Sequence, residues 1–537
     1  MDGEHQNTLY YGDNLKVLDQ YIADESVDLI YLDPPFNSNA SYNMLFMSPD
    51  GSDSDAQISA FDDTWSWGTS AEEAVAWVRD SGHHKTYDLL ETMRAFLGEN
   101  DMMAYLAMMA ARLIELHRVL KPTGSLYLHC DQTASHYLKL LLDGVFGFAN
   151  YRNEIIWQRT SAHGDARVSF GDVTDSVFYY SKTDRPLWNR QFSPLSDEHI
   201  EAKYSNSDDD GRRYTTRDLR SPSPRPNLTY DYNGYKPHPN GWSISRELME
   251  EYDQKGLIYY PKKKDGRLRL KIYLDERQGR PLQNLWTDIS PINSRAQERL
   301  GYPTQKPLAL LERIIAASSN EGDVVLDPFC GCGTALDAAE KLGRKWIGID
   351  VTHLAINLIE QRMRDAHPDA SFKVVGRPES LAGAEELARR DKHEFEKWIV
   401  PKLEGHLFEG GRKGADGGID GFVYFRPDAK KTEKAILSVK GGDNVGVGMI
   451  RDLHSTMERE KALAGVFITK ALPTKPMVTE AAKVGLFDGP SGQKLPRLQI
   501  LTLAEIFAGK RPDLPHIDSP YKKAQRSKKA SGQGKLL

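Results

Sequence analysis

An apolar run, Val27–Leu32, ends abruptly in Asp33-Pro34-Pro35-Phe36, and this junction constrains the fold of the chain most. Residues 26–33 have the pattern of a buried strand. Two consecutive prolines can neither continue a strand ladder nor enter a helix interior, because both need backbone N–H groups that proline lacks. The sequence therefore predicts a strand that stops at an acid and passes into a stiff loop carrying an aromatic side chain.

Strands and helices alternate along the chain after this junction. We expect a helix over 101–120, a strand over 124–130, a helix over 135–147 and two further strands over 153–159 and 175–182. The pattern resumes at 307–350 with helix, strand, helix and strand. Such alternation predicts an α/β fold with a parallel sheet.

The segment from 190 to 285 has a different character. It is rich in Pro, Tyr, Arg and Asn and has no sustained period. We interpret it as an inserted module or an extended set of loops, and a solvated irregular insertion explains the same composition.

A glycine-containing turn links a strand and a helix within "DVVLDPFCGCGTALDAAEKLGRKWIGID". Gly331 and Gly333 let a ligand approach the backbone and the N-terminus of the next helix. Asp350 ends the following strand, where an acid can accept hydrogen bonds from ribose hydroxyls. Leu336 excludes the dinucleotide fingerprint, and no Gly-Lys-Ser/Thr follows to make a P-loop. The turn predicts a nucleoside-containing cofactor, with an ordinary tight turn as the alternative.

Together, the turn Phe329-Cys330-Gly331-Cys332-Gly333 and the loop Asp33-Pro34-Pro35-Phe36 resemble the two signatures of nucleic-acid amino-methyltransferases. The order, with the catalytic loop first, is similar to the permuted β-class, which includes the modification subunits of type III restriction systems. The resemblance covers residues 7 to 360 and implies a Rossmann-like sheet that binds S-adenosylmethionine. The cofactor-binding residues that it implies are Asp13, Gln305, Lys306, Asp327, Phe329, Gly331, Gly333, Thr334 and Asp350. "YPTQKP" at 302–307 departs from the family, which often has His where Tyr302 stands.

The same resemblance makes Asp33, Pro34, Pro35 and Phe36 the catalytic residues. An exocyclic base amine is a poor nucleophile, because its lone pair is delocalised into the ring. The Asp33 carboxylate and the Pro34 carbonyl can accept its two N–H bonds, and the stiff double proline preorganises both acceptors. The base must be flipped out of the duplex, and Phe36 is the expected stacking face. A turn cap for Asp33 and a core position for Phe36 are the structural alternatives.

Asp33 and the three cysteines indicate which base the enzyme would methylate. Cytosine C5 methylation needs a cysteine nucleophile that the family presents after a proline, and none of Cys130, Cys330 and Cys332 follows one. The N4-cytosine enzymes of the family usually carry Ser where Asp33 stands. We therefore expect N6 of adenine as the target, with N4 of cytosine as the alternative.

The segment "GRKGADGGIDGFVYF…KAILSVKGG" resembles the Mrr-like branch of restriction endonuclease folds. That resemblance implies that Asp420 helps to hold Mg²⁺ and that Lys440 stabilises the developing charge. Ser438 departs from the family's acidic or amide position, and Glu396 on the preceding helix is a candidate for the missing carboxylate. The open alternatives are DNA cleavage, a nuclease-like fold that only grips DNA, and an unrelated α/β domain.

These features predict a methyltransferase domain over 1–375 with a target-recognition insertion over 190–285, a linker helix over 376–392, a nuclease-fold domain over 393–508 and a basic disordered tail over 509–537. The net charge of −6 means that local patches must hold DNA, such as Lys262, Lys263, Lys264 and Arg267. The expected partners are double-stranded DNA and either a restriction subunit or a second copy of the chain. RNA methylation and a DNA-binding protein with a dead site are the remaining alternatives.

Cysteine usage and hydropathy suggest the compartment. Three cysteines form no disulfide framework, which fits a reducing environment. The first residues have neither the basic start nor the apolar core of a signal peptide, and the longest apolar run, Met102–Ala111, is too short to span a bilayer. We expect a cytoplasmic protein with no membrane partner.

Overall fold

The computed structural model describes residues 6–35, 41–47, 53–62, 67–161, 169–261, 266–293, 296–302, 304–408, 418–428 and 431–517. The chain divides into two compact units. One unit is formed by residues 190–283, and the other by the segments before and after them. Each unit is described by itself.

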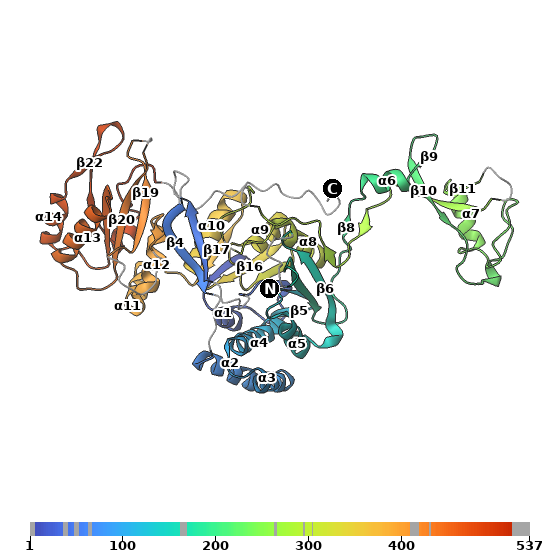
Figure 1. The fold of residues 1–537 in the computed structure, drawn as a ribbon, viewed down its shortest axis with the longest axis horizontal. Helices are drawn as coiled ribbons and strands as arrows, with labels where there is room; N and C mark the ends of the chain where they lie inside the picture. Colours follow the sequence, from blue (N-terminus) through green and yellow to red (C-terminus); the bar gives the residue numbers. More distant parts are fainter. Residues whose placement is uncertain are drawn as a thin grey trace. The chain divides into compact units, whose positions relative to one another are not determined.

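A nine-stranded sheet with the order β14-β6-β7-β5-β2-β15-β16-β1-β17 forms the centre of the first unit (Figure 1). Its strands are β1 (Asn7–Tyr11), β2 (Val27–Leu32), β5 (Leu120–Cys130), β6 (Tyr151–Gln158), β7 (Thr174–Ser181), β14 (Leu285–Trp286), β15 (Val324–Asp327), β16 (Lys345–Asp350) and β17 (Phe372–Val375). The strands β2, β15 and β16 are adjacent although they come from distant parts of the chain. This adjacency brings the proline loop and the glycine turn to one region.

The direction of one strand differs from the prediction of a purely parallel sheet. β7 pairs antiparallel with β5 and with β6, whereas every other pairing between described strands of this sheet is parallel. A parallel return needs a crossover connection, which is usually a helix. The sequence between β6 and β7 has no helical pattern, so the chain turns back antiparallel. The α/β class itself is confirmed.

Helices cover both faces of the sheet. The helices α1 (Asn14–Tyr21), α4 (Asp101–Val119) and α5 (Ser135–Phe146) pack on one face, and α2 (Thr69–Asp80) and α3 (His84–Leu97) pack against α4. The other face carries α8 (Leu308–Ser318), α9 (Thr334–Lys341) and α10 (His353–Ala366). A hydrophobic core lies on each face of the sheet, and alternate residues of a strand pack into one core or the other. In β2, Ile30 packs on the first face and Leu29 on the second. The sheet is therefore buried on both sides, as a parallel sheet requires.

Two further strands, β3 (Ser41–Met47) and β4 (Asp53–Asp62), pair antiparallel with each other.

The second unit is folded rather than irregular. A four-stranded sheet has the order β11-β12-β10-β9 and consists of β9 (Asn206–Ser207), β10 (Arg213–Asp218), β11 (Ile258–Tyr259) and β12 (Arg269–Tyr273). β8 (Phe192–Ser193) pairs with β13 (Arg280–Pro281), and the helices are α6 (Asp197–Lys203) and α7 (Arg246–Gln254). Leu219, Trp242, Met249 and Leu268 form its small core. Short strands explain why no period was visible in the sequence.

The C-terminal part of the first unit contains a five-stranded mixed sheet with the order β18-β19-β20-β21-β24. Its strands are β18 (His406–Leu407), β19 (Gly421–Phe425), β20 (Glu433–Lys440), β21 (Ala464–Thr469) and β24 (Leu498–Thr502), and β22 (Leu486–Asp488) pairs with β23 (Lys494–Pro496). The helices are α11 (Leu381–Arg390), α12 (Lys392–Lys402), α13 (Val447–Arg459), α14 (Lys475–Lys483) and α15 (Leu503–Phe507). The linker helix expected over 376–392 corresponds to α11, and the next helix, α12, begins after Asp391, whose side chain caps it by accepting from the backbone N–H groups of His393 and Glu394.

Candidate cofactor and base pocket

Four acidic residues lie at the carboxyl ends of four adjacent strands. Asp33 follows β2, Asp327 ends β15, Asp350 ends β16 and Asp13 lies two residues after the end of β1. The parallel pairings set these ends side by side: Leu326 lies opposite Ile30 and Tyr11 lies opposite Asp350. Ligands of open α/β sheets bind at this edge.

A cavity of about 740 Å³ opens at this edge. It is large enough for a nucleoside cofactor together with a reacting group. The proline loop, the glycine turn, the 302–306 segment and the helices α2 and α4 all contribute to its wall. The predicted residues that line it are Asp13, Asp33, Pro34, Pro35, Gln305, Lys306, Asp327, Phe329, Gly331, Thr334 and Asp350. Gly333 is at the N-cap of α9 beside this wall, and Phe36 lies outside the described residues.

The glycine turn has the backbone conformation that only glycine adopts without strain. Gly331 has φ +47° and Gly333 has φ +75°. A Cβ at 333 would meet Ile359 Cγ1 at 2.8 Å, and one at 331 would meet the Tyr302 ring at 3.3 Å. A side chain at either position would therefore be strained, and the backbone of Gly331 lies at the cavity wall.

Asp350 is anchored to this turn. Its Oδ2 accepts from the Gly331 N–H at 3.0 Å, and its Oδ1 accepts from the Thr352 N–H at 2.9 Å and from the Thr352 hydroxyl at 2.8 Å. Burial raises the pKa of Asp350 to about 6 in spite of these hydrogen bonds. Burial, assisted by the charges of Asp33 and Asp350, also raises the pKa of Asp327 well above its usual range. The cavity thus concentrates carboxyl groups that favour a cationic ligand.

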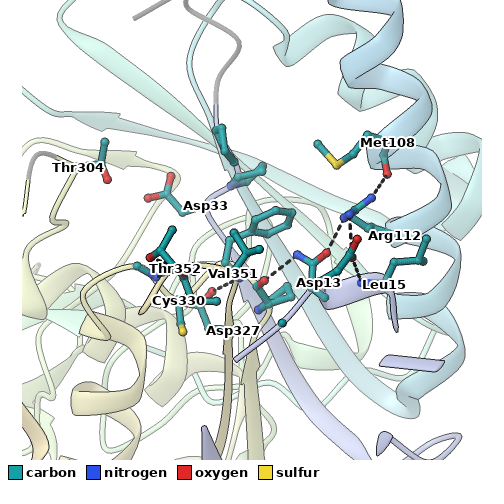
Figure 2. A pocket seen from close by; sticks show the side chains of 18 of the residues that line it. Asp13, Leu15, Asp33, Met108, Arg112, Thr304, Asp327, Cys330, Val351 and Thr352 are labelled. Carbon is teal, nitrogen blue, oxygen red and sulfur yellow. Dashed lines mark hydrogen bonds and ion pairs between the residues drawn. The ribbon is translucent and has the colours of Figure 1, made fainter. Parts of the chain in front are cut away.

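Asp33 is held by a lysine. Lys306 Nζ lies 2.5 Å from Asp33 Oδ2, and both side chains are mostly buried. The other oxygen, Oδ1, is buried and has no hydrogen-bond partner among the described residues. Figure 2 shows the Asp33 carboxylate at the cavity between Thr304 and Asp327. The geometry leaves one carboxylate oxygen available as an acceptor.

Asp13 and Arg112 form the opposite wall, as Figure 2 shows. Asp13 caps α1 by accepting from the Leu15 N–H at 2.8 Å, and Arg112 Nη2 lies 3.0 Å from the same carboxylate. Burial lowers the pKa of Arg112, although Asp13 opposes this shift. Sequence reasoning missed Arg112. The signal for it was a single cation at the end of an otherwise apolar helical run, which marks a buried charge with a partner.

Gln305 and Thr334 line the cavity but also have local partners. Gln305 Nε2 donates to the Glu298 carbonyl at 2.6 Å, and its Oε1 accepts from the Leu300 N–H at 2.8 Å. Thr334 Oγ1 accepts from Arg362 Nη1 at 3.1 Å. These contacts fix the 298–305 segment and the first turn of α9, so both residues shape the wall.

The nuclease-like segment brings Asp420 and Lys440 together. Asp420 Oδ2 accepts from the Val439 N–H at 2.6 Å, and Lys440 Nζ lies 3.3 Å from the same oxygen. Ser438 is buried on β20 between them in sequence. Glu396 lies on α12, where His393 Nδ1 is 3.5 Å from its carboxylate. The structure therefore brings Asp420 and Lys440 together.

Two kinds of feature are absent from the described part of the chain. No three His, Cys, Asp or Glu side chains there come together in a way that could hold a metal ion. None of the helices there combines the length and the apolar character needed to cross a bilayer.

Comparison with known proteins gives two family matches and several relatives. A DNA methylase family matches residues 27–361, and a restriction endonuclease family matches residues 387–494. The type II methyltransferase M.EcaI of Enterobacter cloacae is 32% identical over 48% of this chain and 57% of its own length. The type III StyLTI Mod subunit of Salmonella typhimurium is 24% identical over 63% of this chain and 50% of that protein. The DNA adenine methyltransferase YhdJ of Escherichia coli is 25% identical over 67% of this chain and 84% of that enzyme.

The chain spans about half the length of the first two relatives. The family match, in contrast, covers most of the chain and contains the proline loop, the glycine turn and the strands that carry them. The chain belongs to the DNA methylase family, with a restriction endonuclease-like domain at residues 387–494.

Proposed function

We propose that this chain transfers a methyl group from S-adenosylmethionine to the exocyclic N6 of an adenine in DNA. The observation that carries the proposal is that the Asp33 carboxylate and the glycine turn at 331 line one cavity. An aspartate at position 33 favours adenine, and the name of the YhdJ relative supports this choice. N4 of cytosine is the alternative target, because the matched family includes enzymes for both amines.

The residues of the cavity fit the cofactor. Asp350 can accept from the ribose hydroxyls, the exposed backbone of Gly331 lets the cofactor approach closely, and this proposal assigns the adenine to Asp13, which lines the same cavity. Asp327 lines the cavity, and its carboxyl group can accept a hydrogen bond from the ammonium group of the amino-acid end. When bound, S-adenosylmethionine supplies an electrophilic methyl group.

The proline loop supplies the acceptors for the amine. Asp33 Oδ1 is buried, without a partner among the described residues, and therefore ready to accept one N–H of the base. The Pro34 carbonyl accepts the other in this proposal, and Pro35 stiffens the loop. The two hydrogen bonds favour a tetrahedral nitrogen whose lone pair is available. Phe36 stacks on the flipped base in the same proposal.

A labelling experiment tests the activity. The full chain is incubated with plasmid DNA and S-adenosylmethionine carrying a labelled methyl group, and the DNA is then digested to nucleosides. Label in N6-methyl-2′-deoxyadenosine is expected from the wild type and not from Asp33→Ala. Label in N4-methyl-2′-deoxycytidine would replace the adenine assignment, and equal label from Asp33→Ala would contradict the acceptor role.

DNA recognition is assigned to residues 190–283 in this proposal. The unit is compact and presents exposed basic side chains such as Arg267, which is 57% exposed. Arginine is suited to both phosphate contacts and base edges. A restriction subunit is the proposed additional partner, because the StyLTI relative is a subunit of such an enzyme, and a second copy of the chain is the alternative. The proposed compartment is the cytoplasm, where bacterial DNA lies.

For the restriction endonuclease-like domain we propose DNA gripping. Mg²⁺ at Asp420 does not fit the donors that the described residues provide. Asp420 Oδ2 is already engaged by Val439 and Lys440, Ser438 offers only a weak hydroxyl ligand, and no group of three potential ligands lies there.

The second candidate function is DNA cleavage by this domain. The family match and the Asp420–Lys440 pair favour it. Supercoiled plasmid is incubated with the full chain and Mg²⁺, with Lys440→Ala as the comparison. Intact plasmid with both proteins is expected from a domain that only grips DNA. Linear or nicked plasmid with the wild type alone would establish the nuclease.

A further inference from the structure

A fully exposed phenylalanine lies in the connection between β6 and β7. The side chain of Phe170 is 99% exposed, and no other large apolar side chain in the described part of the chain is exposed to this extent. Single apolar side chains are common on protein surfaces, so exposure alone assigns no role. The position of Phe170 on the sheet is what distinguishes a chance surface residue from one that meets a partner.

The connection that carries Phe170 leaves the sheet at the edge where the cavity opens. β6 runs antiparallel to β7, and β7 runs antiparallel to β5, so β6 has the same direction as β5 and β2. The carboxyl ends of β2 and β6 therefore lie at one edge of the sheet, with β5 and β7 between them. Because neighbouring strands are about 4.8 Å apart, the end of β6 lies about 14 Å from the start of the proline loop.

The two stems of this connection are held together by hydrogen bonds. The Arg159 N–H donates to the Val173 carbonyl at 3.0 Å. Arg159 Nη2 donates to the Asp172 carbonyl at 3.3 Å, and Arg159 Nε lies 3.0 Å from the buried Asp175 carboxylate. Phe170 precedes Val173 by three residues, so its backbone lies within about 11 Å of this stem. The stem therefore keeps the phenylalanine within reach of the cavity edge.

Methyl transfer to a base of duplex DNA opens a gap in the base stack. The proposed target adenine must leave the duplex to reach Asp33, so the duplex has to lie across the carboxyl edge of the sheet with its target over the cavity. The flipped base leaves behind an unpaired partner base and two separated neighbours. An apolar side chain that inserts there replaces the lost stacking. A phenyl ring does this at any sequence, because it makes no base-specific hydrogen bond.

We propose that Phe170 is a wedge that enters the duplex at the position vacated by the target base and so stabilises the flipped-out state. This role rests on the proposed methyl transfer and adds the group that holds the duplex open. Phe36 stacks on the flipped base in that proposal, whereas Phe170 stacks on the partner base that stays behind. Phe170 is not among the described residues that line the cavity, so the wedge acts on base flipping and not on cofactor binding.

The test compares two exposed phenylalanines at opposite ends of β6. Phe170→Ala removes the wedge. Phe148→Ala is the matched control, because Phe148 is 81% exposed but lies in the 3-10 turn Phe148–Asn150, before the amino end of β6. The methylated sequence is first read from plasmid DNA treated with the full wild-type chain, and duplexes of that sequence then serve as substrates.

Rates of label transfer at saturating S-adenosylmethionine measure the effect. We expect Phe170→Ala to lower the rate by about ten-fold to a hundred-fold, the range of one lost aromatic–base stack, with the Kd for S-adenosylmethionine unchanged. Phe170→Trp keeps a flat apolar ring and should retain most of the wild-type rate. Phe148→Ala should react as fast as the wild type.

Two altered duplexes separate a wedge from a side chain that only grips DNA. With 2-aminopurine in place of the target adenine, fluorescence rises when the base leaves the stack, and Phe170→Ala should bind the duplex with a smaller rise than the wild type. With the target adenine opposite an abasic site, there is no partner base to stack on. The rates of Phe170→Ala and the wild type should then become similar.

Equal rates and equal fluorescence for Phe170→Ala and the wild type would overturn the wedge and leave the proposed methyl transfer intact. A rate deficit of undiminished size opposite the abasic site would also overturn the wedge. Absence of label with the wild type would overturn the proposed function and the wedge with it.

Discussion

Lys306 Nζ lies 2.5 Å from Asp33 Oδ2, and the two side chains are only 11% and 14% exposed. The lysine comes from the segment after the second unit, whereas the aspartate follows the second strand of the chain. Sequence reasoning assigned Lys306 to the cofactor. The contact adds a second proposal, in which the lysine orients the catalytic carboxylate so that Oδ1 faces the base.

Removing this cation should slow methyl transfer. We expect Lys306→Met to lower kcat by about ten-fold, because the carboxylate loses the partner that fixes its orientation. Lys121→Met is the matched control, since it breaks a similar ion pair with Asp28 (2.7 Å) outside the cavity and should leave kcat unchanged. Initial rates at saturating cofactor measure both. Equal rates for Lys306→Met and the wild type would refute the orienting role.

Cofactor affinity should depend on pH through Asp350. Its pKa is raised to about 6, so the acceptor is ionised at pH 8 and becomes protonated as the pH falls through 6. The Kd for S-adenosylmethionine, measured by calorimetry, should be constant above pH 7 and should rise below pH 6. In Asp350→Asn the affinity should be weaker at pH 8 and this step should vanish. A step of unchanged size in the variant would assign it to another group.

The glycine turn should be intolerant of a methyl group. Gly333→Ala places a Cβ 2.8 Å from Ile359 at a positive φ, and it should cost about 2–4 kcal/mol of unfolding free energy. Gly322 also has a positive φ (+86°) but has open space around it, so Gly322→Ala should cost only about 1 kcal/mol. Denaturant unfolding of the two variants separates the steric effect from the backbone strain. Similar losses for both would show that Ile359 gives way.

A buried ion pair behind the turn should matter for stability. Arg362 Nη2 lies 2.8 Å from Asp337 Oδ2, and His367 Nε2 lies 2.7 Å from Asp337 Oδ1. Arg362→Leu leaves the buried carboxylate without its main counter-charge and should cost about 3–5 kcal/mol. Arg362→Leu with Asp337→Leu should recover much of this loss, and chemical denaturation measures both. A double variant as unstable as the single one would argue against the charge as the cause.

The same pair has a defined pH dependence. Burial raises the pKa of Asp337, but the charge of Arg362 and the hydrogen bond from His367 bring the pKa below its usual value of 3.8. A group with a lowered pKa in the folded state stabilises it above the unfolded pKa and loses that contribution as the pH falls. Unfolding free energies should therefore drop below pH 4 in the wild type more steeply than in the double variant.

The α/β fold and the family were predictable because they depend on contiguous patterns. Each of these features has a local sequence signal, either a hydrophobic periodicity or residues that end an element. They are the strand before Asp33, the glycine turn and the helix at 101–119. The antiparallel direction of β7 was not predicted, since it depends on a connection without a helix. The small sheet of residues 190–283 was missed because its strands have two to six residues, too few to display alternation.

The site was predictable where loops carry motifs and hidden where partners come from long-range packing. Asp33 and Gly331 were predictable because each lies within a short contiguous sequence motif. Tyr31, His129 and Asp175 look like ordinary strand residues, and only the pairing of β2, β5 and β7 brings them into hydrogen-bonding distance. Arg112 could similarly be recognised as a site residue only in the structure, where α4 packs beside α1 and brings Arg112 next to Asp13.

The position of β15 between β2 and β16 has a consequence for synthesis on the ribosome. The early strands emerge with a central place in their sheet still vacant, and a long stretch of chain, including the whole second unit, is translated before the missing strand arrives. A nascent chain therefore carries its proline loop long before it can assemble a cavity, and methylating capacity should begin only when the last strands of the sheet have left the exit tunnel.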